Sequence, residues 1–374
     1  MTAKDSARLI TSASEIGAAR WNALANPRGL ADPHPFTTFE FFAALEESGS
    51  ASAKTGWQPA HLLLEDGLMP LYLKNHSYGE YVFDHAWAQA LERAGGDYYP
   101  KLQCAVPFTP VTGPRLLGNS SALLKTAAGA TAQLGASSLH ITFLTHAEWQ
   151  AAGEAGYLLR TGQQFHWNNP GYTSFDQFLG ELSSAKRKNL RKERQAVRDA
   201  GVTFDWLTGS DITEAHWDQF FEFYMDTGGR KWGTPYLTRE FFSRLGQSLS
   251  HQTLLVMAKQ NGRTIAGALN LFGEGVLFGR NWGAADYVPF LHFETCYYQA
   301  IDFAIARGLR RVEAGAQGEH KLLRGYLPVE TYSAHVIQHK GLARAVDDFL
   351  GAERAAVTDH IAELAAHAPF RKDK

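Results

Sequence analysis

The stretch PFTTFEFFAALEESGS, residues 35–50, returns 200 positions later as PYLTREFFSRLGQSLS, residues 235–250. Eight of the sixteen positions are identical, whereas ordinary residue frequencies give about one match. In each copy a threonine, Thr38 or Thr238, stands just before apolar residues at helical spacing, which is the pattern of an N-capped amphipathic helix. The repeat therefore predicts the same helix at two places in the chain.

The segments that follow the two helices also correspond in kind. HLLLEDGLMPLYLK, from His61, and LLVMAKQNGRTIAGALNLF, from Leu254, each contain two apolar runs joined by a turn with Asp-Gly or Asn-Gly, the strongest short signal for a hairpin. Further on, the segments from Ala122 and from Glu294 each indicate a helix, a glycine stop and a strand. We therefore predict an α/β (α+β) chain of two related domains.

The repeat also predicts the domain boundaries. We place the first domain at residues 1–155 and the second at 156–374, joined near residues 150–162. A helix over about residues 342–366 is expected to close the second domain. The alternative is that two similar helices arose by coincidence, but the order of the elements after them agrees as well.

Composition excludes several classes of protein. The chain has 374 residues, 45% of them hydrophobic, and a net charge of -2, which favours a folded protein over a polybasic nucleic-acid coat. The two cysteines, Cys104 and Cys296, are too few for a disulfide framework and indicate a reducing compartment. The N-terminal residues lack a signal-peptide core, and no run is long enough to span a membrane. We expect a cytoplasmic protein.

The segment GAQGEHKLLRGYLP, residues 315–328, carries more functional groups than a turn needs. It follows a predicted strand, and the strand expected at residues 276–284 ends in Arg280, Asn281 and Trp282. Polar residues at the ends of neighbouring strands create a cleft, the usual place for ligands in α/β sheets. Glycines let backbone N–H groups approach a developing oxyanion. The alternative is a tight turn followed by a solvated, charged helix start.

A basic helix is predicted at residues 183–201. Seven Lys and Arg residues less two acidic ones give a local charge of +5, and Leu190 and Val197 are expected on its inner side. This asymmetry indicates contacts with phosphates of a nucleotide, a lipid pyrophosphate or an RNA backbone. The alternative is an ordinary solvated face.

Several of these segments resemble one known family. The basic stretch RKNLRKERQAVRDAGV resembles a helix of the FemAB-like branch of the GNAT acyltransferase superfamily. The segments HSYGEYVFDHAW, QFHWNN, RKWGTPYLTREFF and EAGAQGEHKLLRGY are similar to predicted N-acyltransferases grouped as FemAB-like. The resemblance runs from about residue 35 to 335, and it implies two tandem GNAT-like domains, each a mixed central sheet flanked by helices, with a channel between them.

The resemblance implies transfer of an acyl or aminoacyl group onto an amine. FemAB relatives take this group from aminoacyl-tRNA and most GNAT enzymes take it from acyl-CoA, so these are the expected co-substrates, and no tightly bound cofactor is expected. The loop Arg/Gln-x-x-Gly-x-Gly/Ala that grips coenzyme A is not evident before Cys296. FemAB proteins also carry a lysine one residue before their late Gly-aromatic pair, whereas Arg324 directly precedes Gly325 and Tyr326 here.

The candidate site residues fall into three groups. Acid–base chemistry and oxyanion stabilisation suggest as catalytic candidates Glu294, Glu319, His320, Lys321, Arg324 and Tyr326. The expected donor-binding residues are Arg187, Lys188, Arg191, Arg280, Trp282 and Gln317. The polar and aromatic mix of the first domain suggests as acceptor-binding residues His76, Tyr78, Glu80, Asp84 and His85.

Each of these residues has a structural alternative: an N-cap or surface carboxylate, aromatic packing, or a satisfied loop. No metal site is expected, since the His and Glu residues lack ligand spacing. We predict direct acyl transfer to a small-molecule or peptide amine acceptor, possibly with tRNA as a partner. The competing hypothesis is a non-catalytic module that binds a cell-wall precursor or RNA. The sequence does not predict the oligomeric state.

Overall fold

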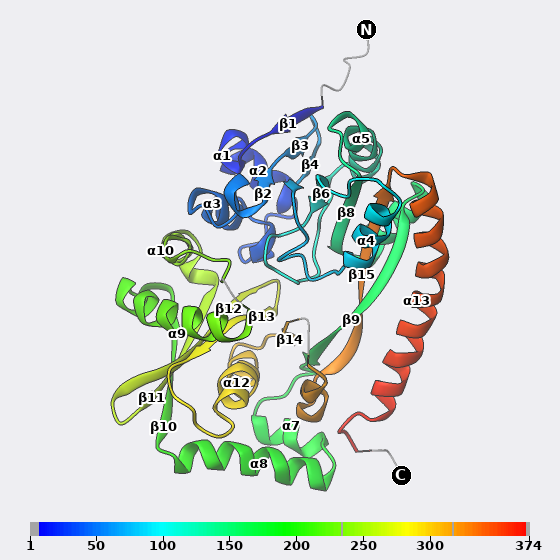
Figure 1. Cartoon of the computed structure of the whole chain (residues 1–374). Helices are drawn as coiled ribbons and strands as arrows, with labels where there is room; N and C mark the ends of the chain where they lie inside the picture. Colours follow the sequence, from blue (N-terminus) through cyan, green and yellow to red (C-terminus); the bar gives the residue numbers. More distant parts are fainter. Residues whose placement is uncertain (1–6, 233–234, 316–317, 372–374) are drawn as a thin grey trace. The chain divides into compact units, whose positions relative to one another are not determined.

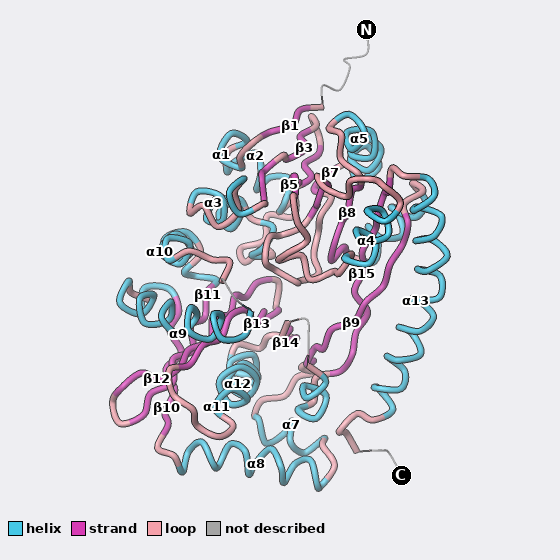
Figure 2. The backbone as a smooth tube through the Cα atoms, viewed as in Figure 1, coloured by secondary structure: helices cyan, strands magenta, loops and turns pink. Residues whose placement is uncertain are grey.

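A computed structural model describes residues 7–232, 235–315 and 318–371, with the backbone alone for residues 230–232 and 319 (Figure 1). The chain forms two compact units. Unit 1 contains Met1–Gln163 and Glu330–His360, and unit 2 contains Gln164–Val329 and Ile361–Lys374. Both units contain helices and strands (Figure 2). The strands β9 (Leu158–Asn168) and β15 (Leu327–Ile337) carry the chain from one unit into the other.

Unit 1 contains two sheets. The larger one has the order β15-β8-β6-β5-β2, and the smaller one has the order β1-β3-β4-β7. The strands are β1 (Arg8–Ile10), β2 (Trp57–Pro59), β3 (His61–Leu63), β4 (Gly67–Met69), β5 (Leu71–Lys74), β6 (Lys101–Cys104), β7 (Leu117–Gly118) and β8 (Ser138–Leu144). Neighbouring strands in these sheets pair antiparallel except β6 and β8, which run parallel over three positions.

The helices of unit 1 flank these sheets. They are α1 (Ala13–Ile16), α2 (Ala18–Ala25), α3 (Phe39–Glu47), α4 (His85–Arg93), α5 (Ser120–Gln133), α6 (His146–Glu154) and most of α13 (Lys340–Ala366), with 3₁₀ turns η1 (Pro35–Thr37) and η2 (Ala53–Thr55). Apolar residues of β5, β6 and β8 pack with those of α5, including Leu102, Leu139 and Leu123. This cluster is the main core of unit 1.

Unit 2 is built on one mixed sheet of the order β10-β11-β12-β13-β14-β9. Its further strands are β10 (Val202–Thr208), β11 (Thr253–Gln260), β12 (Arg263–Gly273), β13 (Val276–Ala284) and β14 (Arg311–Glu313). Its helices are α7 (Phe175–Glu181), α8 (Ser184–Asp199), α9 (Glu214–Trp232), α10 (Arg239–Ser248), α11 (Leu291–Phe293) and α12 (Gln299–Ala306), with 3₁₀ turns η3 (Gly209–Asp211), η4 (Ser250–Gln252) and η6 (Glu319–Arg324), and a π-helical segment η5 (Glu294–Tyr298).

Local signals in the sequence account for these elements. The repeated helices are α3 and α10, and the side chains of Thr38 and Thr238 accept hydrogen bonds from the backbone N–H groups of Phe41 and Phe241. Asn261 adopts a φ of 51° and Gly262 a φ of 77°, so the turn between β11 and β12 has the left-handed geometry that favours hairpins. The predictions of repeated helices, hairpins and a basic helix are confirmed.

The division of the chain differs from the prediction in two ways. The segment expected to be a connection near residues 150–162 contains the end of α6 and the start of β9, a strand that continues without interruption past Gln163. The helix predicted to close the second domain lies mainly in unit 1, where Leu342, Val346 and Leu350 pack against Trp87 and Leu91 of α4. The sequence repeat did not reveal this because α13 has no counterpart in the first half of the chain.

Mutation of one phenylalanine in each repeated helix should destabilise the corresponding unit. Phe42 and Phe242 are both almost completely buried, so Phe42→Ala and Phe242→Ala should each lower the free energy of unfolding by about 3–5 kcal/mol, through lost burial and the cavity left behind. Hydrogen exchange read by mass spectrometry would show the loss in unit 1 for the first variant and in unit 2 for the second. The half-exposed Phe349 supplies the control, and equal stability of Phe349→Ala and Phe242→Ala would contradict the prediction.

Candidate functional site

In unit 2 the strands β13 and β14 pair in parallel over only three positions. The partners are Val276 with Arg311, Leu277 with Val312, and Phe278 with Glu313. Strand β13 then continues to Ala284, paired with β12 alone. Beyond Phe278 the ladder between β13 and β14 is therefore open, and the backbone of β13 has no strand partner on that side within the described residues.

A bulge in β13 lies immediately beyond this point. Asn270 of β12 is opposite Gly279, and Leu269 is opposite Asn281, so Arg280 is the additional residue. A bulge bends a strand and changes the direction of its side chains. Trp282 follows on the bent part, and its ring centroid lies 5.3 Å from that of His292 in α11. The predicted donor-binding residues Arg280 and Trp282 thus both lie on the part of β13 that extends beyond its pairing with β14.

A group of aromatic and histidine side chains connects α11, η5 and η6. The hydroxyl oxygen of Tyr297 lies 3.0 Å from Nε2 of His320, and the rings of His292 and Phe293 are neighbours of His320. Partial burial lowers the pKa of His320, and the cations of Arg324 and Lys321 lower it further. His320 is therefore a neutral imidazole at the protein surface, suited to accept or donate a proton.

Lys321 lies beside this group and is almost completely buried. Its Nζ donates to the backbone carbonyl of Gly315 at 2.9 Å, two residues after the end of β14. Burial lowers the pKa of the Lys321 ammonium to about 8, with Cys296 opposing the shift. A buried ammonium with a pKa close to neutral can stabilise negative charge or exchange a proton.

Glu294 and Arg324 are both held by α8. Arg194 places its guanidinium 2.8 Å and 3.2 Å from the carboxylate oxygens of Glu294 and also pairs with Asp302. Burial raises the pKa of Glu294, and Arg194 opposes that rise. The preceding residue, Glu193, accepts from Arg324 at 2.9 Å and 3.0 Å. These buried pairs attach α8 to η5 and η6.

Arg324 and Tyr326 have little capacity left for a substrate. Arg324 also donates to the carbonyl of His320 at 2.8 Å and lies 3.4 Å from the centroid of the Phe293 ring. Tyr326 is fully buried in the core of unit 2, and its hydroxyl faces the carbonyl of Tyr297 at 3.4 Å. Burial raises the pKa of Tyr326 far above its usual range, so this residue is poorly suited to proton transfer.

A basic pocket of about 520 Å³ lies between α7 and α8. One face of α8 supplies its cations at the spacing of helical turns, and α7 supplies an aromatic ring, a carboxylate and an aliphatic side chain. The lining residues are Phe175, Asp176, Leu179, Arg191, Lys192, Arg194, Gln195 and Arg198. Four cations against one carboxylate make the pocket a suitable place for phosphate groups.

Glu313, the last residue of β14, is a buried carboxylate that the sequence analysis did not select. Its neighbours Val312 and Leu277 pack in the core of unit 2. Because side chains alternate along a strand, Glu313 points to the opposite face with its cross-strand partner His166. Nε2 of His166 lies 3.7 Å from Oε2 of Glu313. Arg311 approaches the other oxygen at 2.8 Å, but without the alignment of a hydrogen bond.

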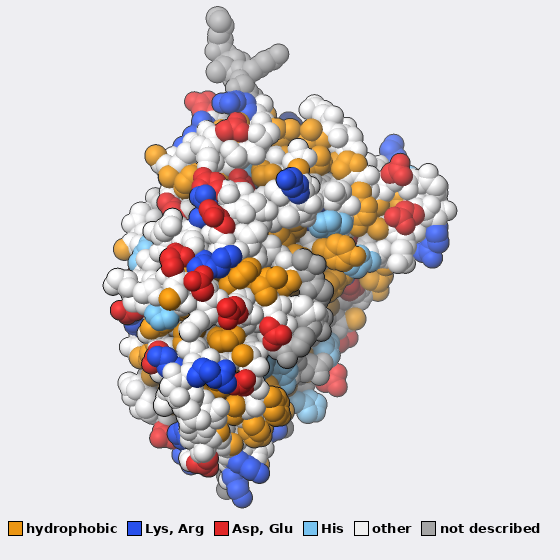
Figure 3. All heavy atoms as spheres, turned by 60° about the vertical axis from the view of Figure 1, so that its left-hand side comes forward, with side chains coloured by type: hydrophobic (Ala, Val, Ile, Leu, Met, Phe, Trp, Pro, Cys, Tyr) orange, Lys and Arg blue, Asp and Glu red, His pale blue; other side chains and the backbone are white. Residues whose placement is uncertain are grey.

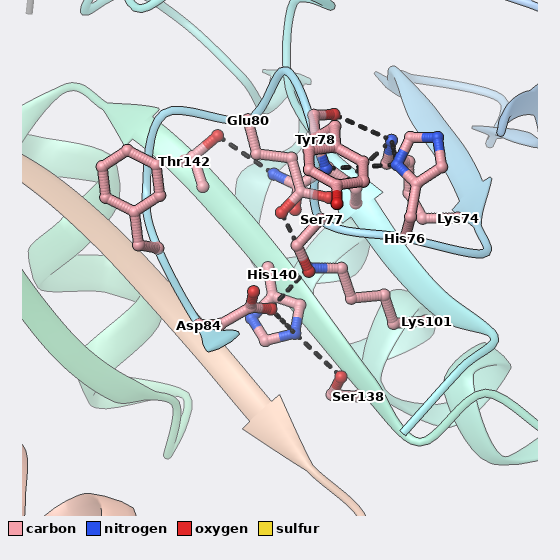
Figure 4. A network of polar contacts seen from close by, with 12 residues as sticks. Lys74, His76, Ser77, Tyr78, Glu80, Asp84, Lys101, Ser138, His140 and Thr142 are labelled. Carbon is pink, nitrogen blue, oxygen red and sulfur yellow. Dashed lines mark hydrogen bonds and ion pairs between the residues drawn. The ribbon is translucent and has the colours of Figure 1, made fainter. Parts of the chain in front are cut away.

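Unit 1 has a different concentration of charge, a buried polar row across β5, β6, β8 and β15. Figure 4 shows the part of this row around Lys101 and His140. Lys74 pairs with Lys101, Gln103 with His140, and His140 with His335. These residues share one face of the sheet, whereas Leu102 and Leu139 face the apolar core. Nδ1 of His140 and Nδ1 of His335 lie 2.7 Å apart, and burial lowers the pKa of His140 to about 3.

Lys101 is the centre of this polar row. Its Nζ donates to Ser77 at 2.8 Å and to Glu80 at 2.7 Å, and it also donates to Asp84. Burial raises the pKa of Glu80 to about 7, although Lys101 opposes the rise. Lys74 lies 3.6 Å from the centroid of the Trp57 ring, and burial lowers its pKa to about 7. The ion pairs attach the segment of residues 77–84 to the sheet.

The comparisons with known proteins agree with this architecture. Residues 12–372 match the model of the FemAB-like family, described as peptidoglycan biosynthesis/recognition. The chain belongs to the FemAB-like family. As a member of this family it is an acyltransferase. No protein with a curated description matches it.

Solved structures similar to this FemAB-like chain share its fold at low identity. FemX is 12% identical with a TM-score of 0.56, over 89% of this chain and 98% of its own. L-PGS from Bacillus licheniformis is 13% identical with a TM-score of 0.52, over 86% and 98%. The C-terminal domain of a putative lysylphosphatidylglycerol synthetase from Agrobacterium fabrum is 11% identical with a TM-score of 0.54, over 91% and 97%. The prediction of two tandem GNAT-like domains is confirmed.

The structure brings some of the predicted catalytic and donor-binding residues together and separates others. His320 and Lys321 lie side by side at the end of β14, whereas Glu294 and Arg324 are committed to α8. Arg191 lines the basic pocket, but Arg187 and Lys188 do not. Gln317 and the side chain of Glu319 lie outside the described part of the FemAB-like chain.

The predicted acceptor-binding residues are divided between the surface and the interior of unit 1. Glu80 and Asp84 are buried in the ion pairs of Lys101. The rings of His76 and His85 lie 5.1 Å and 6.4 Å from that of Tyr78, and the Tyr78 ring is 62% exposed. Of the five predicted acceptor-binding residues, His76, Tyr78 and His85 are thus the ones placed to contact a ligand from solvent.

Removal of the central cation of the polar row should destabilise unit 1. Lys101→Met removes the cation that contacts both Glu80 and Asp84, and we expect a loss of about 3–5 kcal/mol in the free energy of unfolding, measured by urea titration at neutral pH. Lys125→Met, which changes an exposed lysine of the same unit, is the control and should have little effect. Equal stability of the two variants would show that the polar row does not support the fold.

Proposed function

We propose that this FemAB-like protein forms amides by moving an aminoacyl group from aminoacyl-tRNA to an amine acceptor. The observation that carries the proposal is the opening of the ladder between β13 and β14, with the buried ammonium of Lys321 beside it. Unpaired backbone N–H groups and a nearby cation are what a tetrahedral acyl-transfer intermediate requires. The amine attacks the acyl carbonyl directly in this proposal.

Three features of unit 2 have distinct parts in the proposed reaction. A backbone N–H group of β13 beyond its pairing with β14 would donate to the oxygen that becomes negative in the transition state. Lys321 would stabilise the same charge or that of the leaving oxygen, because its ammonium is buried and a buried charge interacts strongly with its neighbours. His320, exposed beside Tyr297, would return a proton to the leaving group.

The basic pocket supports a donor with several phosphates. Arg191, Lys192 and Arg198 are exposed on α8 and line the pocket, so they can contact a nucleic-acid backbone without disturbing the buried pairs of Arg194. The similar lysylphosphatidylglycerol synthetase is named for joining an amino acid to an acceptor. Both observations favour aminoacyl-tRNA as the donor over acyl-CoA.

A transfer assay distinguishes the possible donors. The purified protein is incubated with bulk tRNA charged with radiolabelled amino acids and with a UDP-sugar pentapeptide that carries a free amine, and parallel samples contain labelled acetyl-CoA. We expect label to enter an alkali-stable amide only with charged tRNA. Transfer of label from acetyl-CoA alone would show that the donor is acyl-CoA and not aminoacyl-tRNA. Binding of tRNA or of the pentapeptide without any transfer would instead support a non-catalytic module.

Loss of the Lys321 ammonium should reduce turnover. We expect Lys321→Ala to lower kcat at least about tenfold, which corresponds to roughly 1.4 kcal/mol of transition-state stabilisation, and to change KM little. Lys340→Ala, at an exposed lysine, is the control for the general effect of removing a cation. Normal kcat in Lys321→Ala with an unchanged thermal transition would remove Lys321 from the mechanism.

Removal of the pocket cations should weaken donor binding in a salt-dependent way. The triple variant Arg191→Ala, Lys192→Ala, Arg198→Ala should raise the Kd for tRNA at least about tenfold and reduce the slope of log Kd against log salt by about two to three, because each of the three phosphate contacts contributes nearly one unit of slope. Filter binding at several salt concentrations measures both quantities. The double variant Arg187→Ala, Lys188→Ala, which changes two residues outside the pocket, is the comparison. A larger increase in Kd for this double variant would show that the donor binds at another part of α8.

A further inference from the structure

Glu313 occupies the position where the parallel ladder of unit 2 ends. It is 2% exposed, and it is the last residue of β14 that pairs with β13. A side chain at Gly279, the next residue of β13 after Phe278, would meet the backbone carbonyl of Glu313 at 3.4 Å. The strands are thus still in close contact at Glu313, and β13 continues beyond it without its partner.

The carboxylate of Glu313 is buried and forms an ion pair with Arg311 at 2.8 Å, but it lacks the aligned hydrogen bonds that buried carboxylates usually accept. Neither of its oxygens has a hydrogen-bond partner among the described residues, and neither does Nε2 of the facing His166. By contrast, Glu294 in the same unit accepts hydrogen bonds from Arg194 and Gln299. A buried polar group that lacks a partner costs free energy. Its retention at the end of the ladder is therefore consistent with a role in which a substrate supplies the missing partner.

The surrounding charges give Glu313 the properties of a base near neutral pH. Burial raises its pKa to about 7, and the cations of Arg311, Arg310 and Arg280 oppose the rise. Facing it from β9, His166 is kept neutral because burial, together with Arg311 and Lys321, lowers its pKa to about 3. A carboxylate of this kind can take a proton from an ammonium group. The neutral His166 does not compete for that proton, because its own pKa is much lower.

We propose that Glu313 is the general base that deprotonates the acceptor amine; this rests on the proposed acyl transfer. The carboxylate takes one proton from the acceptor ammonium, and the freed electron pair forms the new C–N bond with the acyl carbonyl. The ester C–O bond of the donor breaks, and the leaving oxygen receives a second proton from the attacking nitrogen through His320. The third hydrogen remains on the amide, and Glu313 releases its proton to solvent.

The pH dependence of the reaction and the titration of one carboxyl group test this assignment. In the wild type, kcat/KM for bulk charged tRNA and the UDP-sugar pentapeptide should fall about tenfold per pH unit below pH 7, because the base must be ionised. Glu313→Gln should lower kcat at least about 100-fold and abolish this limb. In ¹³C-Glu-labelled protein without substrates, one carboxyl signal that titrates near pH 7 should be missing from Glu313→Gln.

Stability measurements and a matched control variant distinguish a catalytic role of Glu313 from a role in folding. The raised pKa of Glu313 means that the folded state holds its proton more tightly than the unfolded state, so wild-type stability decreases as pH rises from about 4.5 to 7. Glu313→Gln removes that decrease and should be no less stable than the wild type at pH 8. Glu222→Gln, at an exposed carboxylate of α9, should keep both the rate and the acid limb.

Three results would overturn the assignment in distinguishable ways. Wild-type kcat and an intact acid limb in Glu313→Gln would exclude Glu313 as the base, whereas the proposal of acyl transfer would still hold. Titration of the Glu313 signal together with the exposed carboxylates would show that it is not a base at neutral pH. If the wild type transfers no label from any donor, the proposed function fails and the role of Glu313 fails with it.

Discussion

The early end of the parallel ladder between β13 and β14 is the constraint on which the candidate site depends. Two strands that stay paired satisfy each other's backbone groups and leave no room for a ligand. Here the pairing stops after three positions, and the bulge at Arg280 turns β13 away from a continued parallel course. The chain after β14 can then form the η6 turn beside it, which places Lys321 and His320 at the same end of the sheet.

Helix α8 stabilises this arrangement through two adjacent residues of opposite charge. Glu193 binds Arg324 of η6, and Arg194 binds Glu294 of η5. Each pair is largely buried, so loss of one partner would leave an uncompensated charge. The face of the same helix that carries Arg191 and Arg198 remains available to solvent. One basic helix thus combines a structural role with a surface suited to phosphates, which explains why its composition alone could not separate the two.

Local patterns predicted the elements, and long-range contacts determined the site. The capping threonines, the Asn-Gly turn and the strand at residues 276–284 depend on neighbours in sequence, and all are found in the structure. Glu313 was missed because alternation with Val312 makes it resemble an outward-facing strand residue. Lys101 was missed because its partners Glu80 and Asp84 are close in space only once β6 is in the sheet. The division into units depended on α13, whose packing against α4 has no local signal.

Each unit contains one pair of parallel strands, but the two pairs end in residues with different chemistry. The parallel pair of unit 1 ends at Cys104 opposite Ile141, two buried residues without a charge at neutral pH. Its buried cations lie outside that ladder, Lys101 just before it on β6 and Lys74 on β5, and they are compensated by Glu80 and Asp84. The parallel pair of unit 2 ends at Phe278 opposite Glu313, a buried carboxylate without an aligned partner. A buried carboxylate that lacks aligned hydrogen bonds costs stability unless a ligand supplies them, so the chemistry of acyl transfer is expected in unit 2. The polar row of unit 1 is better explained by its structural role, which is to attach the segment of residues 77–84 to the sheet.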